Sequence, residues 1–226
     1  MKSQSAPLNV YVIECPSSDD IYNERSEGKA LCEVLHQAGI RAKMRSVTSA
    51  DHFTEALAEY IEICAGFPKG MMRPTLHISA HGNTEGLAIG NDPNVGTWAW
   101  LHSQLVPINQ AIGGELEVCI SACEGFNALR MATIPSVAKP LPFNVMMGPN
   151  YKPTWGEALI GFSAFYLRLI VDQDAHTALA AIRAATGKKD WYCLKGEMAH
   201  DMFIDGVRKI DPSAADSIAA ARPPRA

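Results

Sequence analysis

The sequence predicts an α/β fold with a mostly parallel central sheet and helices on both faces. Short apolar segments rich in β-branched residues alternate along the chain with longer segments of helical periodicity. Such alternation is typical of parallel sheets in which each strand is followed by a helix. The helical segments also begin at capping residues and end at glycine or proline. A length of 226 residues favours one compact domain.

The first half of the chain contains three predicted strands and three predicted helices. Segment 8–14 is β-branched and aromatic, which predicts a buried strand, and the polar segment 16–25 follows it. Ser26 is the expected N-cap of a helix that ends at Gly39. The next elements are a strand over 41–47, a helix capped by Ser49, a strand over 75–80 with a short hairpin partner over 86–89, and a helix over 98–106 that ends before Pro107.

The second half repeats this alternation. The expected elements are a strand over 116–122, a helix over 125–134, a strand over 143–147, a helix that the capping box Thr154–Glu157 opens, and a helix between Asp174 and Gly187. We expect one domain over residues 1–210 and a flexible tail over 211–226.

Composition and charge exclude several classes of protein. With 20 Lys+Arg against 24 Asp+Glu, the net charge of −4 and the lack of a basic block argue against binding to nucleic acid. No apolar run approaches the about 18 residues of a membrane helix, and the first residues do not resemble a secretory signal. The six cysteines lack paired CxxC spacing, which favours reduced thiols and a cytoplasmic location.

The candidate chemistry lies where two predicted strands end. One strand is followed by Ser79-Ala80-His81-Gly82, and another by Ser121-Ala122-Cys123-Glu124. Because the carboxyl ends of parallel strands meet at one edge of a sheet, an imidazole and a thiol are expected to meet there if the strands are neighbours. Histidine activates a thiol, and a helix N-terminus after Cys123 would lower its pKa. The N–H groups of Gly82 and Cys123 are candidates for an oxyanion hole.

Other interpretations of these residues are possible. A cysteine is most often a small buried hydrophobe, and His77 and His81 are spaced as HxxxH, which with a cysteine suggests zinc. Zinc histidines four apart usually lie on a helix, however, and Cys119 and Cys123 lack the spacing of a redox pair. His77 shares one strand face with residues 79 and 81. We expect His77 and Ser121 to support the site without reacting, His77 by holding the local backbone or the His81 ring.

The motifs resemble those of a known family. Segment 76–82, Leu-His-Ile-Ser-Ala-His-Gly, resembles the HxxxHG motif of CHAT domains, the caspase-like cysteine peptidases of clan CD. Segment 120–125, Ile-Ser-Ala-Cys-Glu-Gly, resembles their SACxTG motif without its Thr. The similarity covers about residues 8–205. It implies a caspase-like fold, His81 as the catalytic histidine and Cys123 as the nucleophile.

This resemblance also predicts an activity. It implies a cysteine endopeptidase that forms an acyl-enzyme on protein or peptide substrates, needs no metal or organic cofactor, and is controlled by a partner protein or sensor. The competing hypothesis is a non-catalytic interaction module with the same fold. A dyad that is too far apart, or an occluded Cys123, would favour that module.

The resemblance places the substrate pocket at the loop after the first strand and beside the nucleophile. Ser121, two residues before Cys123, is neutral where the resembling metacaspases carry an acid that binds Arg or Lys. The candidate pocket residues are Asp19, Asp20, Glu24, Arg25 and Glu124. Because Asp19, Asp20 and Glu24 outnumber Arg25 in the loop, we expect a preference for Arg or Lys at the cut, with a small or neutral residue as the alternative. An unpaired Arg25 would instead select Asp.

Overall fold

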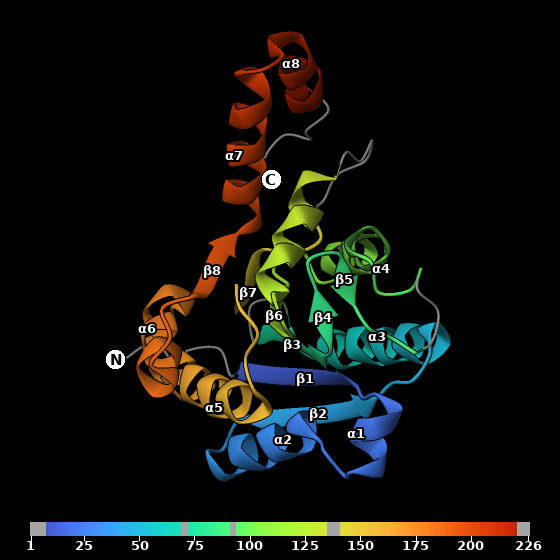
Figure 1. Cartoon of the computed structure of the whole chain (residues 1–226), viewed down its shortest axis with the longest axis vertical. Coiled ribbons are helices and arrows are strands. Elements are labelled where there is room, and N and C mark those ends of the chain that lie inside the picture. The colour runs from blue at the N-terminus through green and yellow to red at the C-terminus, as the bar shows by residue number, and fades with distance from the viewer. Residues whose placement is uncertain (1–7, 69–71, 91–93, 135–140, 221–226) are drawn as a thin grey trace.

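A six-stranded sheet organises the molecule, in the order β2-β1-β3-β6-β7-β8. The computed structural model describes residues 8–68, 72–90, 94–134 and 141–220. The strands of this sheet are β1 (Leu8–Cys15), β2 (Arg41–Ser46), β3 (Arg73–Ala80), β6 (Glu117–Ser121), β7 (Val145–Pro149) and β8 (Trp191–Lys195). All neighbouring pairs are parallel except β7 and β8, so the predicted, mostly parallel sheet is confirmed (Figure 1).

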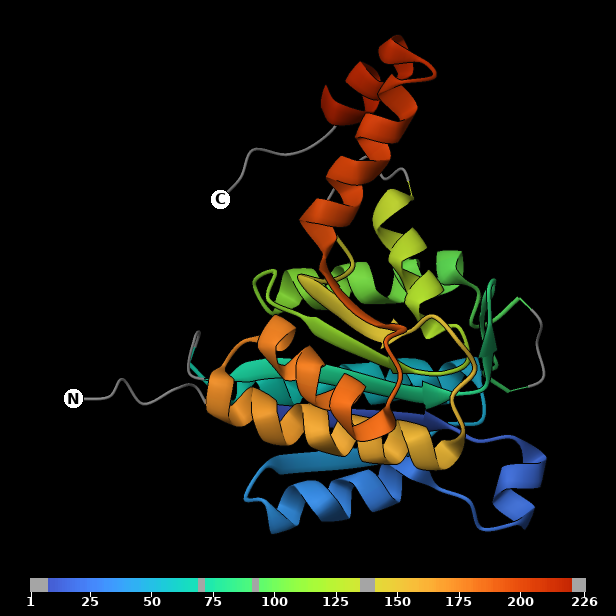
Figure 2. The same ribbon diagram turned by 60° about the vertical axis from the view of Figure 1, so that its left-hand side comes forward.

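Helices cover both faces of this sheet. One face packs against α2 (Glu27–Gln37), α5 (Trp155–Asp172) and α6 (Ala175–Thr186), which share one buried apolar cluster with it. The opposite face packs against α3 (Ala50–Ala65), α4 (Trp98–Ala111) and the 3₁₀ helix η1 (Gly125–Thr133) in a second cluster. Figure 2 shows α5 and α6 in front of the strands. The sheet is therefore buried between two apolar layers, as its parallel strands require.

The predicted helix starts are confirmed by their capping bonds. The hydroxyls of Ser26 and Ser49 accept the backbone N–H groups of Lys29 and His52 at the starts of α2 and α3. Thr154 and Glu157 form the expected capping box of α5. Asp174 caps α6, which ends at Gly187 in the left-handed conformation with φ of 67°. Local capping chemistry thus fixes the starts of four of the helices.

Two short elements follow strands β1 and β3, and both differ from what the sequence predicts. The segment 16–25, expected to be irregular, contains the short helix α1 (Ser18–Tyr22). A short strand does form at the start of the predicted segment 86–89, but its partner is not β3: β5 (Gly86–Leu87) pairs with β4 (Gly82–Asn83) in a separate two-stranded sheet. Both segments lie directly after strands β1 and β3 in the chain, at the carboxyl end of the sheet.

The sequence predicts that helix α4 ends before Pro107. The helix instead continues through Pro107 to Ala111. Proline inside a helix costs about 3 kcal/mol because it removes a backbone hydrogen bond and crowds the preceding turn. Contacts beyond it hold the last turn in place. The Asn109 side chain donates to the Leu141 carbonyl at 2.7 Å and accepts the Leu116 N–H at 2.9 Å, and Ile108 is buried.

The C-terminal part contains elements that the sequence analysis does not predict. Strand β8 forms one edge of the sheet. It is followed by α7 (Gly196–Arg208), which packs against η1, and by α8 (Pro212–Ala220), which lies at the far end of the molecule (Figures 1 and 2). The expected tail after residue 210 is thus helical over Pro212–Ala220. Residues 1–7 and 221–226 lie outside the described residues. Across the described part of the chain, no helix combines the length and apolar character needed to span a bilayer.

Candidate active site

Strands β3 and β6 are neighbours, and their register brings His81 and Cys123 to the same edge of the sheet. Ser79 pairs with Ser121 in the last register pair of the two strands. His81 and Cys123 each follow this pair by two residues, so they leave the sheet at the same level. Gly82 lies close to the backbone of Cys123: a Cβ atom added to Gly82 would be 3.0 Å from the Cys123 carbonyl oxygen. The expected meeting of the two strand ends is confirmed.

Both side chains line one cavity of about 180 Å³ at this edge. Its walls come from the ends of β3 and β6, from the start of α2 through Glu27, and from the start of α5 through Trp155. Cys123 is partly exposed, and the His81 side chain is 49% exposed. A thiol and an imidazole therefore face a shared space that a ligand can enter from solvent.

Asp20 holds the imidazole of His81. The Nε2–H of His81 donates to Oδ2 of Asp20 at 2.7 Å. Among the described residues, Asp20 is the hydrogen-bond partner of the His81 ring. The ring also packs edge-on against Trp155, with 5.8 Å between ring centroids. With Nε2 occupied, Nδ1 is the nitrogen left to exchange a proton. An acid–imidazole pair and a thiol thus share this site, and such groups are able to act as a nucleophile, its base and a group that orients the base.

Asp20 is itself fixed by the start of α1. It is buried and forms a capping box with Ser17, whose N–H and hydroxyl both donate to Oδ2 of Asp20. Burial raises the pKa of this carboxyl, but the hydrogen bonds from Ser17 and His81 outweigh burial, so the pKa lies below its ordinary value. Asp20, expected as a substrate-pocket residue, is therefore an ionised partner of His81.

The pKa of Cys123 moves in the opposite direction to the one expected from a helix N-terminus. Burial raises this pKa above its ordinary value and Glu124 adds to the rise, whereas Lys152 and the backbone N–H of Cys123 oppose it. The first amides of η1 do not reach the thiol, because the Glu124 N–H donates to Tyr151 and the Gly125 N–H donates to Ala122. Glu124 precedes η1 in the left-handed conformation, with φ of 55°. The expected lowering of the pKa is wrong.

His77 and Ser121 both lie beside a buried carboxylate, that of Glu27. The Ser121 hydroxyl lies 2.7 and 2.8 Å from its two oxygens, and the Ser79 hydroxyl donates to it at 2.7 Å. Nε2 of His77 is 3.6 Å from Glu27, and Nδ1 of His77 is 3.0 Å from the Tyr166 hydroxyl. His77 thus contacts the core and Glu27, whereas the ring of His81 is held by Asp20. The two histidines have different partners.

Sequence reasoning did not find Glu27 as a site residue, although a signal was present. Glu27 lies four residues before Leu31 on the face of α2 that turns toward the sheet, where a carboxylate is unusual. The other candidates from the loop after β1, Asp19, Glu24 and Arg25, are exposed and do not line the cavity at Cys123. Glu124 is adjacent to Cys123 but is not part of the cavity wall either.

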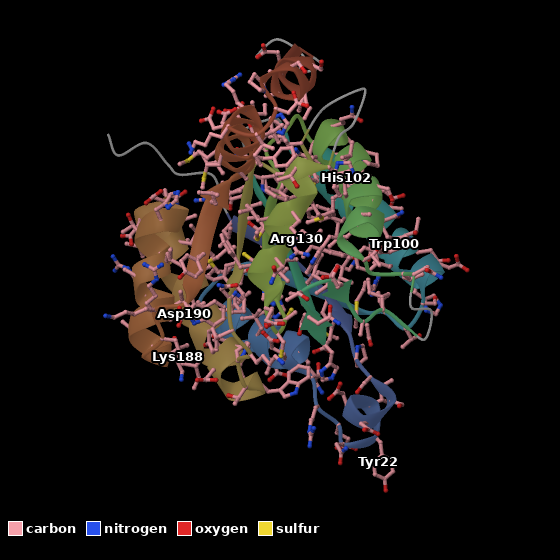
Figure 3. All side chains as sticks on the ribbon, turned by 45° about the horizontal axis from the view of Figure 1, so that its top comes forward. Tyr22, Trp100, His102, Arg130, Lys188 and Asp190 are labelled. Atoms are coloured by element: carbon pink, nitrogen blue, oxygen red, sulfur yellow. The ribbon has the colours of Figure 1, made fainter. Side chains whose placement is uncertain are left out.

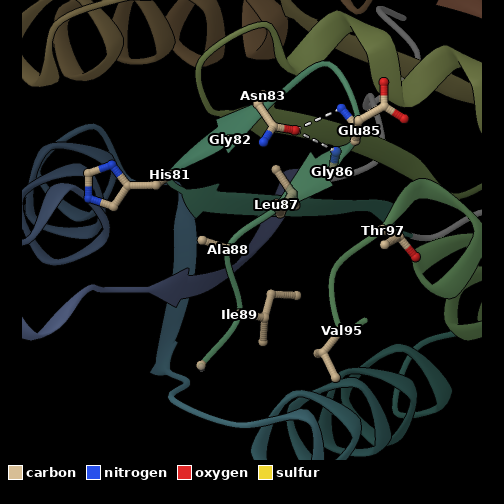
Figure 4. A pocket seen from close by; sticks show the side chains of 11 residues that line it. His81, Gly82, Asn83, Glu85, Gly86, Leu87, Ala88, Ile89, Val95 and Thr97 are labelled. Carbon is tan, nitrogen blue, oxygen red and sulfur yellow. Dashed lines mark hydrogen bonds between the residues drawn. The ribbon is translucent and has the colours of Figure 1, made fainter. Parts of the chain in front are cut away.

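A second cavity, of about 390 Å³, begins on the other side of His81 (Figure 4). It runs along the β4–β5 hairpin, which is shaped by the Asn83 side chain accepting the N–H groups of Glu85 and Gly86. Arg130 of η1, marked in Figure 3, donates to the Thr84 carbonyl at 3.2 Å and so ties the hairpin to the helix after Cys123. His81 thus stands between a small cavity that contains the thiol and a larger groove.

The remaining five cysteines are structural. All are buried and free, and burial raises the pKa of each of them: Cys32 and Cys64 to about 11, Cys15 and Cys193 to about 12, and Cys119 as well. Cys123 differs from them in being partly exposed. A water-soluble electrophile therefore has one accessible thiol among the described residues.

Comparison with known proteins adds no relative. No protein-family model matches the chain, and a search of curated proteins finds no significant match. The resemblance of the two motifs to those of CHAT domains stays a prediction from the sequence.

Proposed function

We propose that the chain is a cysteine endopeptidase with a caspase-like fold, in which Cys123 attacks a peptide carbonyl and His81 moves the proton. The observation that carries the proposal is the convergence of both residues on one open cavity, with the imidazole held by a buried carboxylate. A partly exposed thiol that shares a cavity with a histidine argues against a non-catalytic module.

The residues account for a complete reaction. Nδ1 of His81 takes the thiol proton, the sulfur of Cys123 bonds to the carbonyl carbon, and the oxygen becomes an oxyanion that the N–H groups of Gly82 and Cys123 would bind. The C–N bond then breaks as His81 returns the proton to the amine. Water, deprotonated by His81, attacks the acyl-enzyme, the C–S bond breaks, and the free acid leaves with the thiol restored. Asp20 stabilises the imidazolium in each step.

The raised pKa of Cys123 bears on regulation. At neutral pH the resting thiol is protonated, so its reactivity depends on His81 and on the bound substrate. This fits a peptidase that a partner protein or sensor activates, as the resemblance implies. The buried, unpaired cysteines fit a cytoplasmic location.

Labelling with a peptide electrophile tests the proposal. A peptidyl acyloxymethyl ketone is expected to modify Cys123 and none of the five buried cysteines, as read by mass spectrometry of the native protein. The same reagent should fail on His81→Ala, and Cys123→Ala should cleave no peptide while its thermal unfolding stays cooperative. Cleavage by folded Cys123→Ala would falsify the assignment.

A further inference from the structure

The cavity at Cys123 has a carboxylate in its wall. Glu27 is 4% exposed, and it lines the same small cavity as the thiol and as Ser121, two residues before the nucleophile. At about 180 Å³ the cavity is smaller than the pockets that hold whole small molecules, and it fits one side chain. In the proposed reaction, the side chain nearest to the sulfur belongs to the residue whose carbonyl is attacked.

The fold holds this carboxylate in position. Glu27 lies in the first turn of α2, where the helix dipole favours a negative charge. The start of this helix is fixed by Glu14 of β1, which accepts the Ser26 hydroxyl at 2.6 Å and the Gly28 N–H at 2.8 Å. Gly28 allows the helix to lie close to the sheet, since a Cβ there would meet Met44 at 2.9 Å.

The negative charge of Glu27 has no close cation in the free protein. Within the described residues its ion-pair contact is with His77, at 3.6 Å and beyond hydrogen-bond distance, and no lysine or arginine pairs with it. The hydroxyls of Ser79 and Ser121 supply two protons to a carboxylate that has about four acceptor positions. A buried carboxylate without a counter-ion attracts a cation strongly, because few water molecules screen it.

We propose that Glu27 determines the specificity of the peptidase by binding the side chain of a lysine or arginine directly N-terminal to the cleaved bond. This inference rests on the proposed function. The apolar wall from Trp155 and Ala158 would contact the methylene stem, and the cationic head would reach the carboxylate of Glu27. Position 121 carries a serine and no acid. The carboxylate of Glu27, which accepts a hydrogen bond from the Ser121 hydroxyl, takes the place of that acid.

A matched series of fluorogenic peptides and acyloxymethyl ketones tests this assignment. The series differs only at the residue before the cut, which is lysine, arginine, norleucine, glutamine or aspartate. Norleucine keeps the chain of lysine without its charge. We expect the wild-type protein to prefer lysine over norleucine by about 30-fold or more in kcat/KM. Glu27→Gln, which keeps the size and the hydrogen-bonding oxygen, should lose most of that ratio.

The control is Asp19→Asn, which removes an exposed carboxylate of the neighbouring loop outside the cavity. It should leave the lysine-to-norleucine ratio unchanged. Thermal unfolding shows whether Glu27→Gln is folded, and if it is not, the wild-type ratio and Asp19→Asn decide alone. Wild-type preference for norleucine, glutamine or aspartate, or a lysine preference that survives in folded Glu27→Gln or falls in Asp19→Asn, overturns this inference and leaves the peptidase standing. Labelling of Cys123 by none of the ketones overturns the proposed function itself.

Discussion

At the scale of single residues, three buried acids at the start of the chain have three different tasks. Glu14 holds the first turn of α2. Asp20 binds His81, and Glu27 lies in the wall of the cavity at Cys123. Each is buried to 4% exposure or less, and each accepts hydrogen bonds from hydroxyls, amides or an imidazole. Position in the fold, more than residue type, decides which acid serves structure and which serves the site.

Asp20→Asn tests the role of the acid behind His81. The amide keeps the size of the side chain but does not stabilise an imidazolium, so we expect kcat for peptide cleavage to fall about 100-fold or more with little change in KM. Steady-state kinetics against a peptide series measures both constants.

Ser17→Ala is the matched control for Asp20→Asn. It removes the capping hydroxyl at the same helix start but keeps the carboxylate that binds His81. The loss of the cap should cost about 1 kcal/mol of stability. Because Ser17→Ala also removes the hydroxyl that donates to Oδ2 of Asp20 at 2.6 Å, its kcat should fall, but by much less than that of Asp20→Asn. Equal losses of kcat in both variants would mean that α1 supports the site only through its fold.

The pH dependence of alkylation tests the charges around Cys123. Burial and Glu124 raise the pKa of Cys123, and Lys152 lowers it by less. The thiolate of Cys123 therefore forms at a higher pH than that of an ordinary thiol, whose pKa is about 8.5. The rate of modification by iodoacetamide should therefore rise through a midpoint above about 8.5. Glu124→Gln should move the midpoint down, and Lys152→Gln should move it up. Mass spectrometry of the Cys123 peptide across pH gives the profile, and a midpoint below the ordinary value contradicts this account.

The position of His81 and Cys123 at neighbouring strand ends could be predicted from the sequence, but their charged neighbours could not. His81 and Cys123 follow apolar strands directly, and strand ends are where parallel sheets place ligands. The partners of these residues depend on contacts between distant segments: Asp20 is 61 positions from His81, and Glu27 is 94 positions from Ser121. The direction of the Cys123 pKa shift also depends on where the Glu124 and Gly125 amides point, which the sequence does not reveal.

At the scale of elements, local chemistry predicted helix starts better than helix ends. Ser26, Ser49 and Thr154 cap helices because their hydroxyls reach amides two or three residues ahead, a contact that needs no tertiary structure. Pro107 was expected to end α4, yet tertiary contacts of Asn109 carry the helix past it. The rule that proline ends a helix therefore fails where contacts with distant residues stabilise the helix by more than the proline destabilises it.

The sequence of β8 carries a strand pattern of its own. Trp191 and Cys193 are buried, and Tyr192 between them is exposed, which is the alternation of a strand with one face on the core. Edge strand β2 is more polar, and Glu59 of α3 secures that side by binding Lys43 and Arg45 at 2.6 Å. At the other edge, Arg183 of α6 donates to the Trp191 carbonyl of β8 at 2.6 Å. Both edges of the sheet are thus tied to helices, whereas the strands at its centre are held by apolar burial.

At the scale of the whole molecule, the site and the C-terminal helices are separate. The site lies at the carboxyl end of β3 and β6, between the loop after β1 and the start of α5. Helix α7 is joined to η1 through His200, whose ring lies 3.0 Å from the Ala132 carbonyl. Helix α8 packs chiefly on α7 and lies at the far end of the molecule (Figure 1). The two helices therefore differ in how closely they are coupled to the sheet.

Two truncations test this difference. Ending the chain at Asp211 removes α8 and exposes part of α7 but leaves the sheet and the cavity intact. We expect Cys123 to be labelled at the wild-type rate and the unfolding temperature to fall by no more than about 4 °C. Ending the chain at Lys195 also removes α7, with the contact of His200 to Ala132 and the hydrogen bond of the Gly196 N–H to the Asn144 carbonyl. That loss uncovers the apolar cluster beneath η1, so cooperative unfolding and labelling should both disappear. If removal of α8 alone stops the labelling, the C-terminal helices act on the site.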